Sequence, residues 1–271
     1  MNLYGISTGD LLSMISDGLK KPITKENIFS ESININHLKR IDKIFKKGIH
    51  FYLDPKSLEE NQEASIFFRK NDFGTKLNLE SKRIVSRFED LKISLSAITK
   101  LSELHFERQL PVYSLNDNAK GIAFKVRSIL YPDHFNPKKR DFLKSLIYKL
   151  SEYNILVFEF VETWNKKERA NIDGFFLSPN VIVLKRQQKA FRREIFTLAH
   201  ELGHYLLNEE EVEQFDYTAA SLKSLNNVER WCNDFAFYFL AGEYANRINA
   251  IETVNANNDY HHKELNEISY R

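Results

Sequence analysis

Apolar residues recur every three or four positions over several stretches of the chain, a spacing that predicts amphipathic helices. The longest stretch runs from Ser81 to about Glu107, with apolar residues at Ile84, Phe88, Leu91, Leu95, Ile98 and Leu101. Shorter helices are predicted from Thr8 to Ile15 and after Asn36, because Thr8 and Asn36 can cap a helix N-terminus. The first part of the chain therefore predicts a helical region followed by one long connecting helix.

Three short apolar runs in the second half have the length and side chains of β-strands: Ile155–Val161, Ile172–Leu177 and Val181–Lys185. The tripeptide at 178–180, Ser-Pro-Asn, predicts a hairpin turn between the last two. Helices are predicted at about 118–130 and 137–152 before the strands, and at about 192–208 and 227–244 after them. This order predicts an α+β fold with a small three-stranded sheet.

Changes in the pattern divide the chain into four segments. These are a helical region over 1–75, a connecting helix over 76–112, a mixed domain over 113–245 and a polar tail over 246–271. The tail is rich in asparagine and is expected to fray. No stretch repeats at a fixed period, which excludes solenoids and propellers.

Composition narrows the class of protein further. The chain has 271 residues, of which 42% are hydrophobic and 13% aromatic, enough to bury a core, so a wholly disordered protein is excluded. A single cysteine, Cys232, excludes an internal disulfide and a zinc site built on paired thiolates. No apolar run approaches the roughly 20 residues that cross a bilayer, and the start lacks a signal-peptide pattern. We expect a soluble, cytoplasmic protein without membrane contact.

The helix predicted at 192–208 contains the sequence His200-Glu201-Leu202-Gly203-His204, which has the form HExxH. The two histidines lie one turn apart on one helix face, so both imidazoles can reach a zinc ion at about 2.0–2.1 Å. Glu201 lies about 100° around the helix from His200, where it can act on a zinc-bound water as general base without being a ligand. The alternative is a structural helix whose histidines face solvent.

Gly203 lies in the middle of this predicted helix, where glycine costs about 1 kcal/mol relative to alanine. Its presence predicts that another element crosses the helix closely at this residue.

A catalytic zinc ion usually has three protein ligands, so a third must come from elsewhere in the chain. The acidic candidates downstream are Glu209, Glu210, Glu211, Glu213, Asp216, Glu229 and Asp234. The run at 209–213 follows the helix end too closely to fold back easily, and it is interpreted as a solvated face. Glu229 begins the next helix and can point across at the two histidines. We therefore select Glu229 as third ligand, with Asp234 as the alternative.

Cys232 lies one helical turn after Glu229, from where a thiolate could approach the metal. Its neighbours Trp231, Phe235 and Phe239 make that helix face apolar, and a buried cysteine usually acts as a small hydrophobic residue. We predict that Cys232 packs in the core and is not a ligand.

Two strings carry a family resemblance: FTLAHELGH at Phe196–His204 and ERWCNDFA at Glu229–Ala236. They resemble the ImmA/IrrE metallopeptidases, whose pattern is T-x-A-H-E-x-G-H followed by E-x-x-A-N-x-F-A. The strand segment GFFLSPNVIVLK at Gly174–Lys185 is also similar, so the resemblance covers roughly residues 115–245. It implies that the segment 113–245 is a zincin-like metallopeptidase domain.

Residue by residue, the resemblance places the zinc ligands on His200, His204 and Glu229 and the general base on Glu201. The second motif is also matched by Asn233, Phe235 and Ala236, whereas Cys232 stands where the family usually has alanine. An exposed strand edge of the hairpin predicted at residues 172–185 could hold an extended substrate by backbone pairing. The candidates for stabilising the oxyanion are Tyr205, Tyr217 and Tyr238, for which core packing is the simpler interpretation.

The resemblance also implies a partner. The expected substrate is a specific regulatory protein, an Xre-type repressor, whose cleavage releases transcription under stress or on induction of a mobile element. The alternative is a non-proteolytic transcriptional regulator or an antitoxin-like binding protein that keeps the metallopeptidase fold.

The first part of the chain resembles the Xre-type helix-turn-helix module, at Pro22-Ile23-Thr24 and at Phe67–Lys70. Residues 1–200 hold 34 Lys and Arg against 24 Asp and Glu, so contact with DNA is possible on charge alone. The basic residues are scattered, however, and no helix clusters Arg, Asn or Gln as a recognition helix does. A degenerate interaction region is therefore favoured over a DNA-reading domain.

Overall fold

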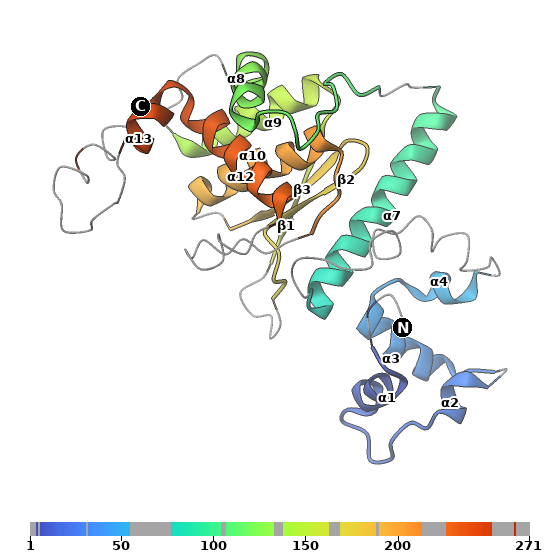
Figure 1. The fold of residues 1–271 in the computed structure, drawn as a ribbon. Coiled ribbons are helices and arrows are strands. Elements are labelled where there is room, and N and C mark those ends of the chain that lie inside the picture. Colours follow the sequence, from blue (N-terminus) through green and yellow to red (C-terminus); the bar gives the residue numbers. More distant parts are fainter. Residues whose placement is uncertain are drawn as a thin grey trace. The chain divides into compact units, whose positions relative to one another are not determined.

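The computed structural model describes residues 4, 6–30, 32–54, 77–103, 107–132, 138–162, 169–187, 190–212, 226–250 and 263. The chain divides into two compact units. The first comprises Met1–Leu95 and Glu168–Asn171, and the second comprises Ser96–Lys167 and Ile172–Arg271. Figure 1 shows helices throughout and one small sheet, so the predicted α+β class is confirmed. The four-segment division made from the sequence stays a prediction.

The first unit begins with short helices around a small apolar core. The helices are α1 (Thr8–Ser16), α2 (Glu26–Phe29), α3 (Ile35–Phe45) and α4 (Ile49–Leu53). The buried core side chains are Tyr4, Leu11, Ile15, Ile23, Ile41, Ile44 and Phe45. The apolar spacing therefore predicted α1 and α3 correctly.

The helix caps of this unit differ from the predicted ones. The side chain of Ser7, not Thr8, accepts the first-turn N–H bond in α1. Asn34, not Asn36, caps α3 in the same way. In both cases the cap is a nearby polar residue whose backbone is extended, as a capping residue requires. The sequence alone does not show which of two neighbouring polar residues has that backbone conformation.

The long predicted helix is present as α7 (Leu79–Leu101), which begins two residues earlier and ends six residues earlier than the prediction of 81–107. Asn78 begins it, since its side-chain oxygen accepts the N–H of Ser81 at 2.9 Å. After Leu101 the helix stops, and Glu103 has the left-handed φ of 54°. A left-handed residue ends a helix regardless of the apolar spacing beyond it.

The second unit contains the sheet, whose strand order is β1-β3-β2. The strands are β1 (Leu156–Val161), β2 (Gly174–Leu177) and β3 (Val181–Arg186). Strands β2 and β3 form the predicted antiparallel hairpin, with Leu177 opposite Val181 across the three-residue turn. Strand β1 joins β3 in parallel. All three predicted strands are therefore confirmed.

Helices pack against this sheet around one large core. They are α8 (Ala119–Leu130), α9 (Lys139–Glu152), α10 (Phe191–Leu207) and α12 (Asn227–Ala241). Helix α10 lies on β2 and β3, while α12 packs on α10 and α8 (Figure 1). The predicted start of α9, at about residue 137, lies outside the described residues.

The C-terminal end of this unit departs from the prediction at one point. A short 3-10 helix, η2 (Gly242–Tyr244), follows α12, and then comes α13 (Ala245–Asn249). The first residues of the segment expected to fray are therefore helical, and Ala245 is buried. Among the helices that the structure describes, none is long and apolar enough to cross a membrane.

Candidate metal centre

Helix α10 carries the HExxH sequence within the core of the second unit. It lies between the sheet and α12, so every residue from Thr197 to Leu207 is buried. The side chains of His200 and His204 belong to residues that are only 1% and 2% exposed. The alternative of a structural helix with solvent-facing histidines is therefore wrong.

The two helices of the site cross at Gly203. A Cβ atom at this residue would lie 3.1 Å from both Cα and Sγ of Cys232 on α12. Contacts this short are tighter than most side chains make, so a side chain at residue 203 would require Cys232 to shift by a few tenths of an ångström. The close crossing predicted from Gly203 is confirmed.

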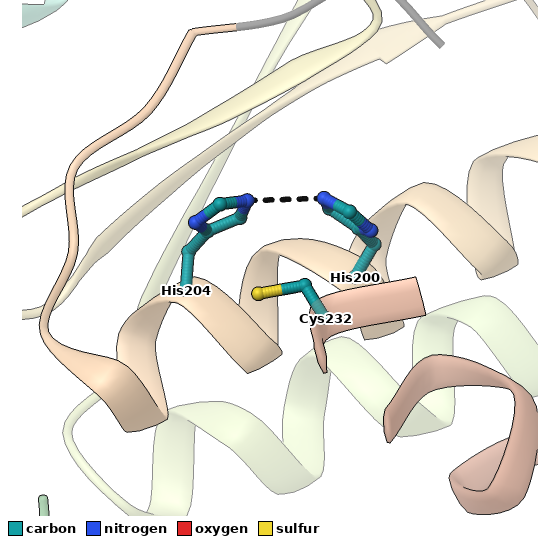
Figure 2. A group of neighbouring side chains, drawn as sticks. All are labelled: His200, His204 and Cys232. Atoms are coloured by element: carbon teal, nitrogen blue, oxygen red, sulfur yellow. Dashed lines mark hydrogen bonds between the residues drawn. The ribbon is translucent and has the colours of Figure 1, made fainter. Parts of the chain in front are cut away.

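This crossing brings both histidine rings to Glu229, the first-turn acid of α12. Nε2 of His200 lies 3.0 Å from Nε2 of His204. One carboxylate oxygen of Glu229 is 3.1 Å from His200 Nε2, and the other is 3.0 Å from His204 Nε2. Figure 2 shows the two rings with these nitrogens facing each other.

Zinc fits this donor set. Ligand atoms about 2.0–2.1 Å from a tetrahedral zinc ion lie roughly 3.3 Å from one another. The three distances here, from 3.0 to 3.1 Å, are close to that spacing. Two imidazoles and one carboxylate are also ligands that catalytic zinc sites use, with a fourth position left for water.

Each imidazole is held at its other nitrogen. Nδ1 of His200 lies 3.0 Å from Oδ1 of Asn233, and Nδ1 of His204 lies 3.2 Å from the backbone carbonyl oxygen of Glu209. Both oxygens accept hydrogen bonds, so each Nδ1 carries the proton and donates it. The lone pair of a neutral ring is then on Nε2, which faces the centre.

The ionisation of the three groups suits a cation. Burial raises the pKa of Glu229, but the close contacts with the rings of His200 and His204 outweigh it and hold the pKa well below its usual range. Burial lowers the pKa of His200. Burial also acts to lower the pKa of His204, but Cys232 and Glu229 outweigh it, and this pKa lies above its ordinary value. Metal binding by His204 therefore releases a proton, and we expect metal affinity to increase with pH.

Residues 150–243 match the peptidase M78 family, described as the IrrE N-terminal-like domain. This match supports assignment of residues 150–243 to the ImmA/IrrE family. Neither the curated proteins nor the solved structures gave a match. The match bears out the resemblance drawn from the two motifs, and it supports a metallopeptidase-type function with a protein substrate and a metal cofactor.

In this IrrE-like domain, Glu201 lies on the side of α10 that faces β2. A Cβ atom on Gly174, the first residue of β2, would lie 3.2 Å from Cγ of Glu201. Glu201 is 4% exposed and occupies a different helix face from the two histidines. The assignment of Glu201 as general base stays a prediction.

The other acidic candidates take different positions in the IrrE-like domain. Glu210 accepts the N–H of Ser178 at 2.8 Å and holds the hairpin turn. Asp234 is exposed on α12 and is not brought to the histidines. Glu213 and Asp216 lie outside the described residues, as does Tyr217. Among the tyrosines considered for the oxyanion, Tyr205 is fully buried with its ring edge-on to Phe176, as core packing predicts.

Cys232 offers a second possible ligand set. Its sulfur and the two histidine nitrogens lie within 4.8 Å of one another, and Figure 2 shows the thiol below the two rings. Burial raises the pKa of this thiol to about 11, so the thiolate form that binds metals is disfavoured at neutral pH. The contact of Cys232 with Gly203 accounts for a small side chain at this position.

Replacing Cys232 with alanine is expected to leave metal content and peptide hydrolysis unchanged, under reducing and oxidising conditions alike. The substitution should cost about 1 kcal/mol in the free energy of unfolding, because it leaves a small void at the helix crossing. Metal analysis and chemical denaturation measure the two effects. A large rise in activity would mean that the thiol occupies the position of the attacking water.

Gly174 is expected to be required for the packing of β2 on α10. A Cβ atom there would lie 2.7 Å from Cγ2 of Thr197, so Gly174→Ala should destabilise the protein by about 1–3 kcal/mol. Thr197→Ser removes that methyl group, and the double variant should regain part of the loss. Denaturant unfolding of the four proteins in this cycle measures the coupling. Additive costs would show that the methyl group is not the obstacle.

Proposed function

We propose that the chain is a zinc-dependent endopeptidase of the HExxH type. His200, His204 and Glu229 would hold the zinc ion, and Glu201 would be the general base. The observation that best supports this is the convergence of two histidine nitrogens and one ionised carboxylate within 3.1 Å of one another. Zinc, when bound, supplies Lewis acidity toward the peptide carbonyl and the attacking water.

Glu201 would move the protons of the reaction. Its carboxylate takes a proton from the water that attacks the scissile carbonyl carbon, and the same carboxyl group delivers it to the leaving amine nitrogen. The C–N bond then breaks with a neutral amine as product. The burial of Glu201 against Gly174 supports this role, because a fixed carboxylate needs little reorganisation before the transfer.

Strand β2 would hold the substrate in an extended form. Within the described sheet, β2 pairs with β3 alone, so its other edge has no strand partner there. The N–H of Lys185 donates to the carbonyl of Asp173 at 2.8 Å, so residues 173 and 185 are a hydrogen-bonded pair. Every second residue of β2 therefore directs its N–H and C=O groups to β3, and the residues between them direct these groups to the other edge. Gly174 and Phe176 then direct their N–H and C=O groups away from β3. All four residues of β2 are buried in this structure, so this edge must be uncovered before a peptide can pair with it. Because Gly174 adjoins Glu201, a peptide paired there would lie along the site.

The proposed substrate is a specific regulatory protein of the Xre repressor type, cleaved in the cytoplasm to release transcription under stress or on induction of a mobile element. The test is incubation with candidate repressors encoded nearby, with and without a chelator, followed by mass analysis of the products. A single cut that requires metal supports the proposal. Stoichiometric zinc without any cut would contradict this choice of substrate, and the absence of bound zinc would favour the non-proteolytic regulator.

We also propose that the first helices are an interaction region and not a DNA reader. Arg40 is the arginine of α3, and its guanidinium donates to the backbone carbonyls of Ile15 and Asp17 at the end of α1. A side chain used in this way holds two helices together and is not available to read base edges. Binding of duplex DNA that persists at 200 mM salt would contradict this interpretation.

A further inference from the structure

The strand order β1-β3-β2 places β1 at the edge of the described sheet opposite to β2 (Figure 1). The N–H of Leu156 donates to the carbonyl of Asn180 at 2.8 Å, so Leu156 directs its backbone groups to β3. The alternation of a strand then turns the N–H and C=O groups of Val157, Glu159 and Val161 away from β3. Within the described sheet β1 pairs with β3 alone, so these groups have no strand partner there. Val161 is 61% exposed, so this edge, unlike that of β2, is accessible from solvent.

A groove of about 570 Å³ lies between this edge of β1 and helix α9. Its apolar lining includes Ile147 and Tyr148 from α9 and Val157 from β1. Tyr148 is 67% exposed, and exposed aromatic side chains are enriched where proteins bind one another. A strand added to β1 would place every second side chain on the α9 side, against these residues.

The charged side chains of the groove are Lys144, Glu159 and Arg186. Arg186 forms ion pairs with Glu159 and with the buried Glu194. Among the residues that the structure describes, no carboxylate lies within ion-pair distance of Lys144. An acidic side chain entering the groove would therefore pair with Lys144 without breaking an existing ion pair.

We propose that the groove between α9 and the outer edge of β1 is a docking site for an extended segment of a partner protein. The segment pairs with the backbone of β1, carries apolar residues at alternate positions, and has an acidic residue opposite Lys144. A second copy of this chain fits less well, because the strand it would offer, β1, has one acid, Glu159, which is already paired with Arg186. The groove contains none of the proposed metal ligands, so this proposal does not rest on the zinc chemistry.

The first experiment selects binders to the full chain from a displayed library of random decapeptides. We expect the enriched peptides to alternate apolar residues and to share one position with Asp or Glu. The variant Lys144→Glu should select Lys or Arg at that position. Lys139→Glu is the matched control, because it makes the same change at an exposed residue about 140° around α9 from Lys144, and it should select the same peptides as the wild type.

The affinities of one enriched peptide and of its acid-to-lysine form, measured by fluorescence polarisation, complete a double-mutant cycle. Binding of the acidic peptide should weaken about 10-fold in Lys144→Glu, and the lysine form should recover that loss. Circular dichroism checks the fold of the variant. If Lys144→Glu does not fold, the lysine form of the peptide tested on the wild type decides, because it must bind about 10-fold more weakly.

Backbone pairing is tested by methylating the peptide nitrogens one at a time. Binding should be lost at every second position, because only alternate N–H groups face β1. Amide exchange of Val157, Glu159 and Val161 should also slow when the peptide is bound. Failure to enrich any peptide, absence of an acidic preference, or equal tolerance of methylation at all positions overturns the proposal. Self-association of the chain that Lys144→Glu abolishes, measured by sedimentation, would instead assign the groove to a second copy and overturn the proposal as well.

Discussion

Replacing Glu201 with glutamine is expected to lower peptide-bond hydrolysis by about 10²–10⁴-fold, the usual contribution of general acid–base catalysis. The amide has the shape of the carboxylate and should keep the packing against Gly174. It cannot accept a proton from water, so the chemical step is lost while the metal and the fold remain. Cleavage rate, zinc content and thermal unfolding, measured on one preparation, separate these effects.

The matched control for this variant is Glu243→Gln, which makes the same chemical change at an exposed residue after α12. It should cleave like the wild type. Unchanged cleavage by Glu201→Gln would remove Glu201 from the mechanism. A parallel loss of zinc and of activity would instead mean that Glu201 supports the metal.

The parts of the fold that depend on local pattern could be predicted from the sequence. The strands are short runs of apolar residues separated by a proline-containing turn, and α10 and α12 show the helical spacing of their buried faces. The position of the two histidines on one face follows from helix geometry alone. Even the crossing of two helices was predictable, because Gly203 in mid-helix is explained by a close neighbour.

What holds the site residues in place was harder to predict, because backbone groups have no sequence signature. The carbonyl of Glu209 reaches His204 because Asn208 adopts a left-handed φ of 55° and turns the chain back. The sequence suggested that this acidic run could not fold back, and it does so through its backbone and not its carboxylate. The bond from Asn233 to His200 joins residues 33 positions apart, and the motif match alone gave it no role.

Two arginines that the sequence analysis did not single out also stabilise the site helices. Arg108 donates to the carbonyl of Tyr205 near the end of α10 and stacks on that ring. Arg127 donates to the carbonyls of Phe239 and Leu240 near the end of α12. Both arginines donate to carbonyls in the last turn of a helix, and pairings of this kind depend on tertiary structure.

Replacing Glu229 with alanine is expected to have the largest effect on metal binding. The substitution removes the carboxylate that lies within 3.1 Å of both histidine nitrogens. Zinc affinity should therefore fall by more than about 100-fold. This loss is larger than the one expected when a residue that only orients a ligand is replaced. Asp234→Ala is the matched control, because it removes an exposed carboxylate from the same helix. Metal content after dialysis and competition with a chelator measure both variants.

The outcomes of this experiment distinguish three ligand sets. Loss of zinc in Glu229→Ala with full occupancy in Asp234→Ala supports two histidines and Glu229. The reverse result would mean that Asp234, which is exposed in this structure, is the third ligand. If Glu229→Ala keeps its zinc and the further change Cys232→Ala removes it, the thiol is a ligand, because its sulfur lies within 4.8 Å of both nitrogens and a bound metal can displace its proton.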